Sequence, residues 1–576
     1  MNIIKTILII IFLTALTIKL KAVTLTSTEQ LNQVHQSFQE QHQNYQNYEP
    51  DITLSEIIYD EQSTKGLMSL IISQEEKTFK TINYKKFIQD LYKRKIYRPI
   101  WFNHDGIKQE AVNELFVQIE SDNTLERFGK LKTLSQKLKK EIKNIKERNM
   151  GKELMLDLKL SSLYRRYMGH HLYGSIQWRN FKRKIKYQKA AWETYNPNYN
   201  IADMLLHYKI SDIVARTTPS SFKYNQLSNH LSRLRKVQAA GGWRKIPASS
   251  QLRYGKAGKQ VSRLIARLRS EGDYTCQGNS NKFGPCLKKA IKRFQKRHQI
   301  GQTGTINNTT RRKLNISVNW KIKKLLLNLD RIKRMPDQAE DRYIMVNIPD
   351  YRLYYKENGR NALTMAVIVG DKKHHTPIFS NKVSFIVLNP YWFIPDSIVK
   401  KEIIPGLLKD PNYLANRGYE VRRSYSLKRP PINTSKIDWA RVLRTGQTKK
   451  YKFMQPPGPR NALGKIKFKF PNKFAVYLHD TPNRKLFKKY PRAFSHGCVR
   501  IANPNGLLAT FAKHERSVNY NRSKRVLRGK VKTQLNLANP VPVHITYLTA
   551  RIKSDGLVHY LPDVYGYDAL QRRSID

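Results

Sequence analysis

The spacing of apolar residues changes near position 341, and this change divides the chain into a helical part and a strand-rich part. Before it, apolar side chains recur every three or four residues, as at Leu131, Leu134 and Leu138, which places them on one face of a helix. After it, short runs rich in β-branched residues, such as 343–348 and 363–369, end at proline or glycine. Runs of this kind are typical of strands. The pattern predicts an α+β, multidomain chain.

The length and apolar content support several packed domains. At about 150 residues per domain, 576 residues correspond to two to four domains. An apolar fraction of 40% is enough to bury cores, which excludes a wholly disordered chain. The predicted order is a signal peptide or anchor at 1–22, a poorly ordered lead-in at 23–83, a helical scaffold at 84–250, a small three-helix unit at 251–318, and a mostly β domain at 341–570 with an inserted lid at about 397–453.

The charge of the chain is strongly positive. It has 106 Lys and Arg residues against 43 Asp and Glu residues, a formal net charge of +63. Such a charge favours an anionic partner. The basic residues are spread along the whole length and form no zinc-finger spacing, aromatic ribonucleoprotein motif or basic zipper. We therefore predict a basic surface drawn to anionic envelope polymers, and no nucleic-acid partner.

The N-terminal segment predicts export to the periplasm or cell envelope. Residues 6–18 are thirteen uncharged, mostly apolar residues between Lys5 and Lys19. The stretch is shorter than the about 20 residues that span a bilayer, but it suits the core of a signal peptide. Cleavage after Ala22 fits less well, because Leu20 is not the small residue usual at the −3 position. The alternatives are an uncleaved anchor, with membrane association through the N-terminus, and a buried core helix.

The three cysteines are too few for a disulfide scaffold. Cys276 and Cys286 lie in the loop between the first two helices of the 251–318 unit, where an oxidising compartment allows them to pair. Their nine-residue gap is not a usual zinc-ligand spacing, so we predict no metal site. Pairing of these two leaves Cys498 as the odd cysteine, which marks a free, reactive thiol.

The segment from His479 to Arg500 carries residue types suited to nucleophilic catalysis. A cysteine attacks a carbonyl as its thiolate, so it needs a base or a positive environment near neutral pH. His479 can supply the base, although it lies 19 residues from Cys498. We expect His479 to end a strand over 474–478. Gly497 lets the backbone approach closely before Cys498, where consecutive N–H groups can face an oxyanion.

His479 together with the string Ser495-His496-Gly497-Cys498-Val499-Arg500 strongly resembles the L,D-transpeptidase catalytic domain of the YkuD type. The strings Asn389-Pro-Tyr-Trp392, Gln455-Pro-Pro-Gly458 and Asn461-Ala-Leu-Gly464 extend the resemblance to the larger periplasmic members of that family. The run 290–314 is similar to the three-helix peptidoglycan-binding domain. The larger members also carry a helical scaffold and a lid inserted in the catalytic domain, in the order predicted here.

The resemblance implies roles for individual residues. Cys498 would be the nucleophile and His479 the base that activates it, with the backbone carbonyl of Asp480 orienting the imidazole. The N–H groups of His496, Gly497 and Cys498 would bind the oxyanion. Further candidates for contact with the substrate are Arg500, Tyr477, Ser495, Trp392 and Asn461. As alternatives, Arg500 fixes the loop, Trp392 belongs to the core and Asn461 shapes a turn. No metal or organic cofactor is implied.

The same resemblance implies an enzyme that forms 3→3 cross-links between peptidoglycan stem peptides through a cysteine thioester, and that carbapenems acylate. With water or a protein lysine as acceptor, the enzyme would instead be an L,D-carboxypeptidase or would anchor proteins to peptidoglycan. An alternative of another class is a non-catalytic protein that binds envelope glycan through the 251–318 unit and its positive charge.

Overall fold

The computed structural model describes residues 54–73, 82–125, 129–145, 147–248, 252–278, 281–336 and 341–572. The predicted signal peptide or anchor at 1–22 lies outside the described residues. Within the described ranges, no helix is both long and apolar enough to cross a bilayer. The chain divides into two compact units, Met1–Gly174 with Pro197–Pro219, and Ser175–Asn196 with Ser220–Asp576.

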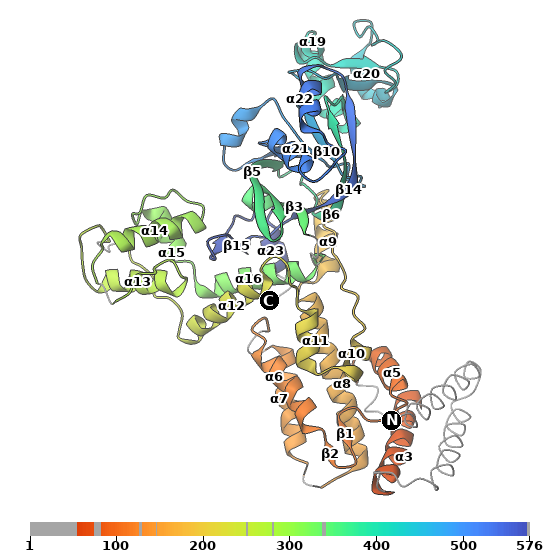
Figure 1. Ribbon diagram of the computed structural model, residues 1–576, viewed down its shortest axis with the longest axis vertical. Coiled ribbons are helices and arrows are strands. Elements are labelled where there is room, and N and C mark those ends of the chain that lie inside the picture. The colour runs from red at the N-terminus through yellow and green to blue at the C-terminus, as the bar shows by residue number, and fades with distance from the viewer. Residues whose placement is uncertain are drawn as a thin grey trace, which may run out of the picture. The chain divides into compact units, whose positions relative to one another are not determined.

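The first unit is a helical bundle built around α8. Its described elements are α3 (Leu54–Met68), the π-helix η1 (Ser69–Ser73), α5 (Lys85–Arg94), β1 (Phe102–Asn103), β2 (Gly106–Ile107), α6 (Gln109–Ser121), α7 (Lys130–Lys143), α8 (Met150–Tyr173), α10 (Ile201–His207) and α11 (Ile210–Thr217). α6, α7 and α8 lie side by side (Figure 1). The buried Asp157 of α8 accepts backbone N–H bonds from Ile100 (3.1 Å) and Trp101 (2.7 Å), which fixes the chain entering β1.

Most of the described residues of the lead-in, which is predicted to be poorly ordered, are helical. α3 continues directly into η1, and Leu67 and Ile71 are buried in one cluster with Leu91 and Leu158. The prediction of disorder is wrong over 54–73, because a few apolar residues on one helix face contribute little to the average composition and yet bury against α5 and α8.

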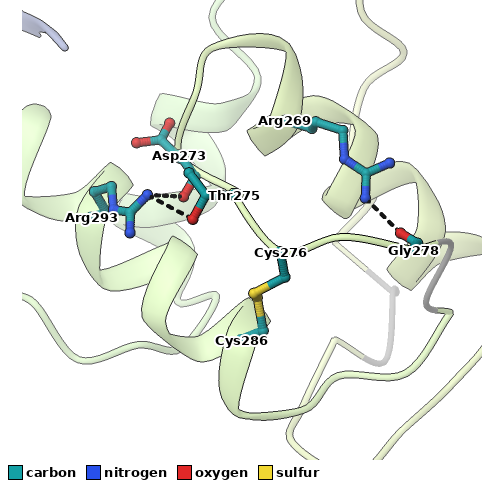
Figure 2. The surroundings of a disulfide bond; sticks show 7 residues. All are labelled: Arg269, Asp273, Thr275, Cys276, Gly278, Cys286 and Arg293. Atoms are coloured by element: carbon teal, nitrogen blue, oxygen red, sulfur yellow. Dashed lines mark hydrogen bonds between the residues drawn. A yellow bond between two sulfur atoms is a disulfide. The ribbon is translucent and has the colours of Figure 1, made fainter. Parts of the chain in front are cut away.

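In the second unit, the predicted three-helix bundle is formed by α13 (Lys259–Ser270), α14 (Pro285–Arg297) and α15 (Asn308–Leu314). Their shared core includes Leu264, Leu287 and Phe294. Cys276, in the loop between α13 and α14, forms a disulfide with Cys286 in the first turn of α14 (Figure 2). Two arginines hold the same loop, since Arg293 donates to the carbonyl of Asp273 (3.0 Å) and Arg269 donates to the carbonyl of Gly278 (2.8 Å).

Buried charges join this bundle to the rest of the second unit. The fully buried Arg297 donates to the Asp273 carboxylate (2.7 Å) and to the carbonyl of Val558 (2.6 Å). Glu271 accepts from Lys321 of α16 (Val318–Lys333), with both nitrogen–oxygen distances at 2.6 Å. Because an unpaired buried charge costs several kcal/mol, these pairs require one specific arrangement of bundle and neighbours.

The strand-rich domain is a nine-stranded sheet that closes on itself. Its order is β12-β5-β13-β11-β10-β6-β14-β3-β4, and β4 also pairs with β5. The strands are β3 (Arg342–Asn347), β4 (Arg352–Glu357), β5 (Arg360–Gly370), β6 (Phe379–Leu388), β10 (Ile466–Lys469), β11 (Leu478–His479), β12 (Ala493–Ser495), β13 (Val499–Ile501) and β14 (Thr533–Thr546). The predicted α+β class is confirmed.

Alternate residues of these strands point into one large core, which helices complete. Val367, Leu478 and Val499 belong to it, together with residues of α9 (Trp178–Tyr187), α21 (Pro504–Ala512), α22 (Tyr520–Arg528) and α23 (Tyr567–Arg572). Trp178 and Phe181 of α9 lie in this core, so part of the predicted scaffold segment packs with the sheet. Outside the predicted lid, the other described elements of the unit are α12 (Tyr224–Ala239), η2 (Ile348–Asp350), η5 (Arg484–Lys488), β15 (Ala550–Ile552) and β16 (Val558–Tyr560).

The predicted lid segment, together with residues 392–396 just before it, folds as a small layer with its own core. It contains β7 (Trp392–Phe393), α17 (Asp396–Ile398), η3 (Val399–Ile403), α18 (Ile404–Lys409), α19 (Tyr413–Arg417), β8 (Glu420–Arg422), α20 (Trp439–Arg444), η4 (Gln447–Lys450) and β9 (Lys452–Gln455). α19 and α20 lie together at one end of the unit (Figure 1). The strand order is β7-β9-β8, and Ile403, Trp439 and Phe453 fill the core.

One predicted strand differs in extent. β11 begins at Leu478 and not at Phe474, because the Asn472 side chain holds the preceding residues in a turn. Its oxygen accepts from the N–H groups of Phe474 (3.0 Å) and Val476 (3.2 Å), and Ala475 has φ +54°. His479 still ends the strand, as expected.

Candidate active site

Cys498 lies in the short loop between β12 and β13, beside β11. β11 and β13 are parallel neighbours, with His479 opposite Arg500. The Val499 N–H donates to the Tyr477 carbonyl (3.1 Å). Residues two apart in extended chain share a face of the sheet. Tyr477, His479, Cys498 and Arg500 therefore lie on one face, with Cys498 next to Tyr477 and diagonal to His479. Hydrogen bonding between the Tyr477 and Cys498 side chains agrees with this placement.

The His479 ring is held in one orientation. Its Nδ1 lies 2.6 Å from the carbonyl oxygen of Asp480, and its side chain is buried. Because a carbonyl oxygen only accepts, Nδ1 carries the proton, and Nε2 of the neutral ring has the free lone pair. Nε2 is thus the nitrogen available to take a proton from a neighbouring group.

Burial and positive charges decide the ionisation of both residues. Burial, followed by the charges of Arg500 and Lys467, lowers the pKa of His479 to about 3. Loss of water also raises the pKa of the Cys498 thiol, although Tyr477, Lys467 and Arg500 act in the opposite direction. At neutral pH Cys498 is therefore a thiol and His479 a neutral imidazole, so the thiol proton must move as the sulfur attacks.

We expect alkylation of Cys498 by iodoacetamide to accelerate about tenfold per pH unit between about pH 6 and about pH 9. Only the thiolate reacts, and its fraction rises tenfold per pH unit while the pH stays below the thiol pKa, which is raised here. The rate is measured by intact-protein mass spectrometry of quenched samples. A plateau reached by about pH 7 would indicate a preformed thiolate–imidazolium pair and contradict this electrostatic description.

Hydrogen bonds within the loop before Cys498 fix its path. The Ser495 hydroxyl donates to the Cys498 carbonyl (2.5 Å) and accepts from the Gly497 N–H (3.2 Å). Thr376 donates to the Gly497 carbonyl (2.8 Å), and Gly497 has φ +113°, a conformation that favours glycine. Ser495 thus braces the loop. Of the three N–H groups expected at an oxyanion, that of Gly497 is already bonded within the protein.

The Asp480 side chain anchors the segment that follows His479. Its carboxylate accepts from the N–H groups of Lys465 (2.8 Å) and Thr481 (2.7 Å) and pairs with Arg484. Gly464 packs directly against it. A Cβ at position 464 would lie 2.4 Å from the carboxylate, and the backbone there has φ +59°.

We expect Gly464→Ala to destabilise the protein by about 2 kcal/mol, because it combines backbone strain with a steric clash. It should also lower turnover, since displacement of Asp480 moves the carbonyl that orients His479. Gly446→Ala is the matched control, because it has a similar φ of +69° and nothing within 4 Å of the added Cβ. Thermal unfolding and turnover are measured for both. Equal effects of the two variants would show that the contact with Asp480 is unimportant.

The lid reaches the loop that carries Cys498. Glu402 of η3 lies 2.5 Å from Nε2 of His496, whose ring is 4.6 Å from that of His374. Lid and sheet together bound a cavity of about 410 Å³, lined by residues that include Arg417, Tyr419 and Arg500. The Arg500 Nε is buried and has no hydrogen-bond partner in the described part of the chain. Because Arg500 lies opposite His479 and Thr481 follows it closely in the chain, the cavity begins beside His479.

Two of the candidate substrate contacts, Trp392 and Asn461, are not among the residues that line this cavity. Trp392 packs in the lid core, 6.3 Å from the Tyr419 ring. Asn461 is buried, donates to the carbonyls of Pro390, Gln455 and Pro456, and accepts from the Leu463 N–H. Its hydrogen-bonding groups are thus used within the protein. For both residues the geometry agrees with the structural alternative.

Sequence reasoning did not place Lys467 or Glu402 at the site. Lys467 lies opposite His479 in β10, with its Nζ 3.7 Å from the centre of the Tyr477 ring. The alternation of Ile466 and Phe468 with Lys467 was a signal for an outward-facing lysine, but not for its neighbour. Among the residues that the structure describes, no group of three or more His, Cys, Asp or Glu side chains is arranged to hold a metal ion.

Three segments of the chain match models of known protein families. Residues 341–514 match the family model described as "L,D-transpeptidase catalytic domain". Residues 341–514 are thus similar to the catalytic domain of L,D-transpeptidases. Residues 86–231 match a "Scaffold domain", and residues 257–314 match a "Putative peptidoglycan binding domain". The predicted resemblance is confirmed, and Cys498 and His479 both lie inside the matched transpeptidase domain.

One curated protein is similar in sequence to this chain. A "Putative L,D-transpeptidase" of Haemophilus influenzae is 36% identical over 245 residues, which cover 42% of this chain and 48% of that protein. The chain thus matches about half the length of this relative.

Solved structures with detectable likeness include transpeptidase domains. An L,D-transpeptidase of Stackebrandtia nassauensis is 15% identical, with 51% of this chain and 94% of that chain covered and a TM-score of 0.20. An L,D-transpeptidase of Xylanimonas cellulosilytica is 13% identical, with 52% and 100% covered and a TM-score of 0.15. At these low scores, the assignment of the transpeptidase domain depends on the family match.

Proposed function

We propose that this protein is a peptidoglycan L,D-transpeptidase that forms 3→3 cross-links through a cysteine thioester. The observation that carries the proposal is the parallel register of β11 and β13, which puts Cys498 and His479 on one face of the sheet. The bond from His479 Nδ1 to the Asp480 carbonyl supports it, because it leaves Nε2 free to act as a base.

In the first step, the Cys498 sulfur attacks the carbonyl carbon after the L-centre of a diaminopimelyl residue in a donor tetrapeptide. His479 Nε2 takes the thiol proton as the C–S bond forms. The developing oxyanion is stabilised by N–H groups of the loop 496–498. The Gly497 N–H can contribute only after its hydrogen bond to the Ser495 hydroxyl breaks. The C–N bond then breaks, and terminal D-alanine leaves with the proton returned by the imidazolium.

In the second step, a side-chain amine of an acceptor stem peptide attacks the thioester. His479 accepts a proton from this amine, the C–S bond breaks, and the Cys498 thiol is restored. The thioester keeps the energy of the donor peptide bond, so cross-linking requires no ATP. No step requires a metal or organic cofactor.

The cavity under the lid suits the free carboxylates of a stem peptide. Three arginines line it, namely Arg417, Arg460 and Arg500, and the lining residues within the described chain include no Asp or Glu. A guanidinium binds a carboxylate through two parallel hydrogen bonds. The partnerless Nε of Arg500 is available for such a contact, which supports the role of this residue in substrate binding.

The proposed location is the periplasm, reached through the N-terminal signal. Peptidoglycan stem peptides and glycan are the proposed partners, with carbapenems as acylating inhibitors of Cys498 and a membrane contact through the N-terminus if the signal stays uncleaved. The net charge of +63 supports an anionic envelope environment.

The acceptor separates the alternatives within the family. Purified disaccharide tetrapeptide is incubated with the protein, and the products are identified by mass spectrometry. We expect 3→3 cross-linked dimers together with free D-alanine. Tripeptide without dimers would indicate a carboxypeptidase, and products only in the presence of a lysine-bearing protein would indicate an anchoring enzyme. Neither products nor stoichiometric labelling of Cys498 by a carbapenem would favour the non-catalytic glycan-binding protein.

A further inference from the structure

A second polar cavity lies between the three-helix bundle and the outer face of the sheet. Its volume is about 510 Å³. Lys296 and Gln299 at the end of α14 form one wall, Arg352 and Thr364 on β4 and β5 form another, and Lys553 in the turn between β15 and β16 closes it. None of these residues takes part in the chemistry proposed for Cys498.

The cavity has more positive charge than its own carboxylates neutralise. Lys296, Arg352, Arg492 and Lys553 line it, against Asp350 and Asp555. Asp350 accepts from Lys553 (2.8 Å) and Gln299 (3.3 Å), and Asp555 lies 2.7 Å from Nε2 of His559. The carboxylates are thus already engaged inside the protein.

Two of the cations are free to bind an anion. Across the described residues, the side chains of Lys296 and Arg352 form no hydrogen bond or ion pair. Burial, together with the like charge of Arg352, lowers the pKa of Arg492, so the two guanidinium groups lie close enough to repel each other. An anionic group placed between them would relieve that repulsion.

The neutral groups of the cavity suit a ligand with sugar rings and amides. Tyr490 is 56% exposed. Its ring stands on edge to that of Tyr351 at 5.7 Å, and its hydroxyl donates a hydrogen bond to Gln299 (3.0 Å). Exposed Asn361 and Thr364 add an amide and a hydroxyl.

The register of the sheet relates this cavity to the Cys498–His479 pair. β4 and β13 both pair with β5, with Arg352 opposite Ala366 and Arg500 opposite Ile368. Directly opposed residues share a face, as do residues two apart in one strand. Arg352 and Arg500 therefore lie on the same face, with only β5 between their strands.

We propose that this cavity binds a second, carboxylate-bearing stem peptide of peptidoglycan, next to the one that is acylated. This proposal rests on the proposed function, because the second stem peptide would belong to the same polymer as the acylated one and lie along the same face of the sheet. The free carboxylates of the peptide contact Arg352 and Lys296, and the attached sugar lies against Tyr490.

The test is isothermal titration of the full chain carrying Cys498→Ala with disaccharide tetrapeptide, which this variant cannot turn over. We expect two sites. Adding Arg352→Glu should remove one site or weaken it at least about tenfold, and Arg352→Gln should weaken it less. Arg525→Glu on exposed α22 makes the same charge change outside the cavity lining and should leave both sites intact. Unchanged melting temperatures show that the variants are folded.

The outcomes separate the two proposals. If the cavity does not bind, Arg352→Glu and Arg525→Glu will have equal effects on affinity, and this inference is overturned. If only the assignment of the active site is wrong, the titration will show a single binding site for the tetrapeptide, and Arg352→Glu will remove that site. A peptide-free N-acetylated oligosaccharide should bind at least about tenfold more weakly than the tetrapeptide; equal binding would overturn the role of the carboxylates.

Discussion

Replacing Cys498 by alanine is expected to abolish both D-alanine release and cross-linking. The methyl group cannot form a thioester, so turnover should fall by about 10⁴-fold or more. The other two cysteines cannot substitute, because Cys276 and Cys286 are joined in a disulfide. Release of D-alanine from tetrapeptide and formation of dimers are measured for the wild-type and variant proteins.

Binding and stability provide the control for this variant. Cys498 is half-buried, and its side chain has only a long contact of 3.8 Å to the Ala475 carbonyl and the bond with Tyr477, so alanine should change the melting temperature little. Tetrapeptide should still bind. Retained turnover in a folded Cys498→Ala protein would refute the assignment of the nucleophile.

The second large effect is expected for His479→Gln. Glutamine has a similar shape and can still meet the Asp480 carbonyl, but it cannot accept the thiol proton. We expect turnover to fall by about 10²–10⁴-fold at pH 7, the usual range for loss of a general base. Because hydroxide can then generate the thiolate, the residual activity should rise about tenfold per pH unit up to the raised pKa of Cys498.

The wild-type pH profile provides the comparison for this variant. His479 acts as a base only when it is neutral, and its pKa is lowered to about 3. Protonation of this residue should therefore limit wild-type activity only below about pH 4. An acid limb of the wild-type profile near pH 6.5 that disappears in His479→Gln would show that the imidazole is not held in this buried state.

The local motif and the periodicity of the sequence predicted much of this architecture. Short runs rich in β-branched residues located β3, β5 and β6, and the string around Cys498 located the loop between β12 and β13. The bond from His479 to the Asp480 carbonyl agrees with what the resemblance implied. It could be predicted because it joins neighbouring residues and depends on the local backbone alone.

Contacts between distant segments were beyond prediction from one sequence. The pairing of Lys467 with His479 depends on strand order, and the contact of Glu402 with His496 depends on how the lid folds back. The packing of Trp178 against the sheet core likewise follows from tertiary structure, since an amphipathic helix does not specify which surface it covers. The start of β11 depends on the side-chain bonds of Asn472, which override the strand preference of 474–477.

The most direct test of the central claim is the identification of the acyl-enzyme. The protein is mixed with donor tetrapeptide in the absence of an acceptor, quenched in acid within seconds, and analysed by intact and peptide mass spectrometry. The proposed thioester requires a mass increase equal to the donor less D-alanine, located on the peptide that contains Cys498 and released by hydroxylamine. Liberation of D-alanine with no adduct, or with an adduct at another residue, would contradict it.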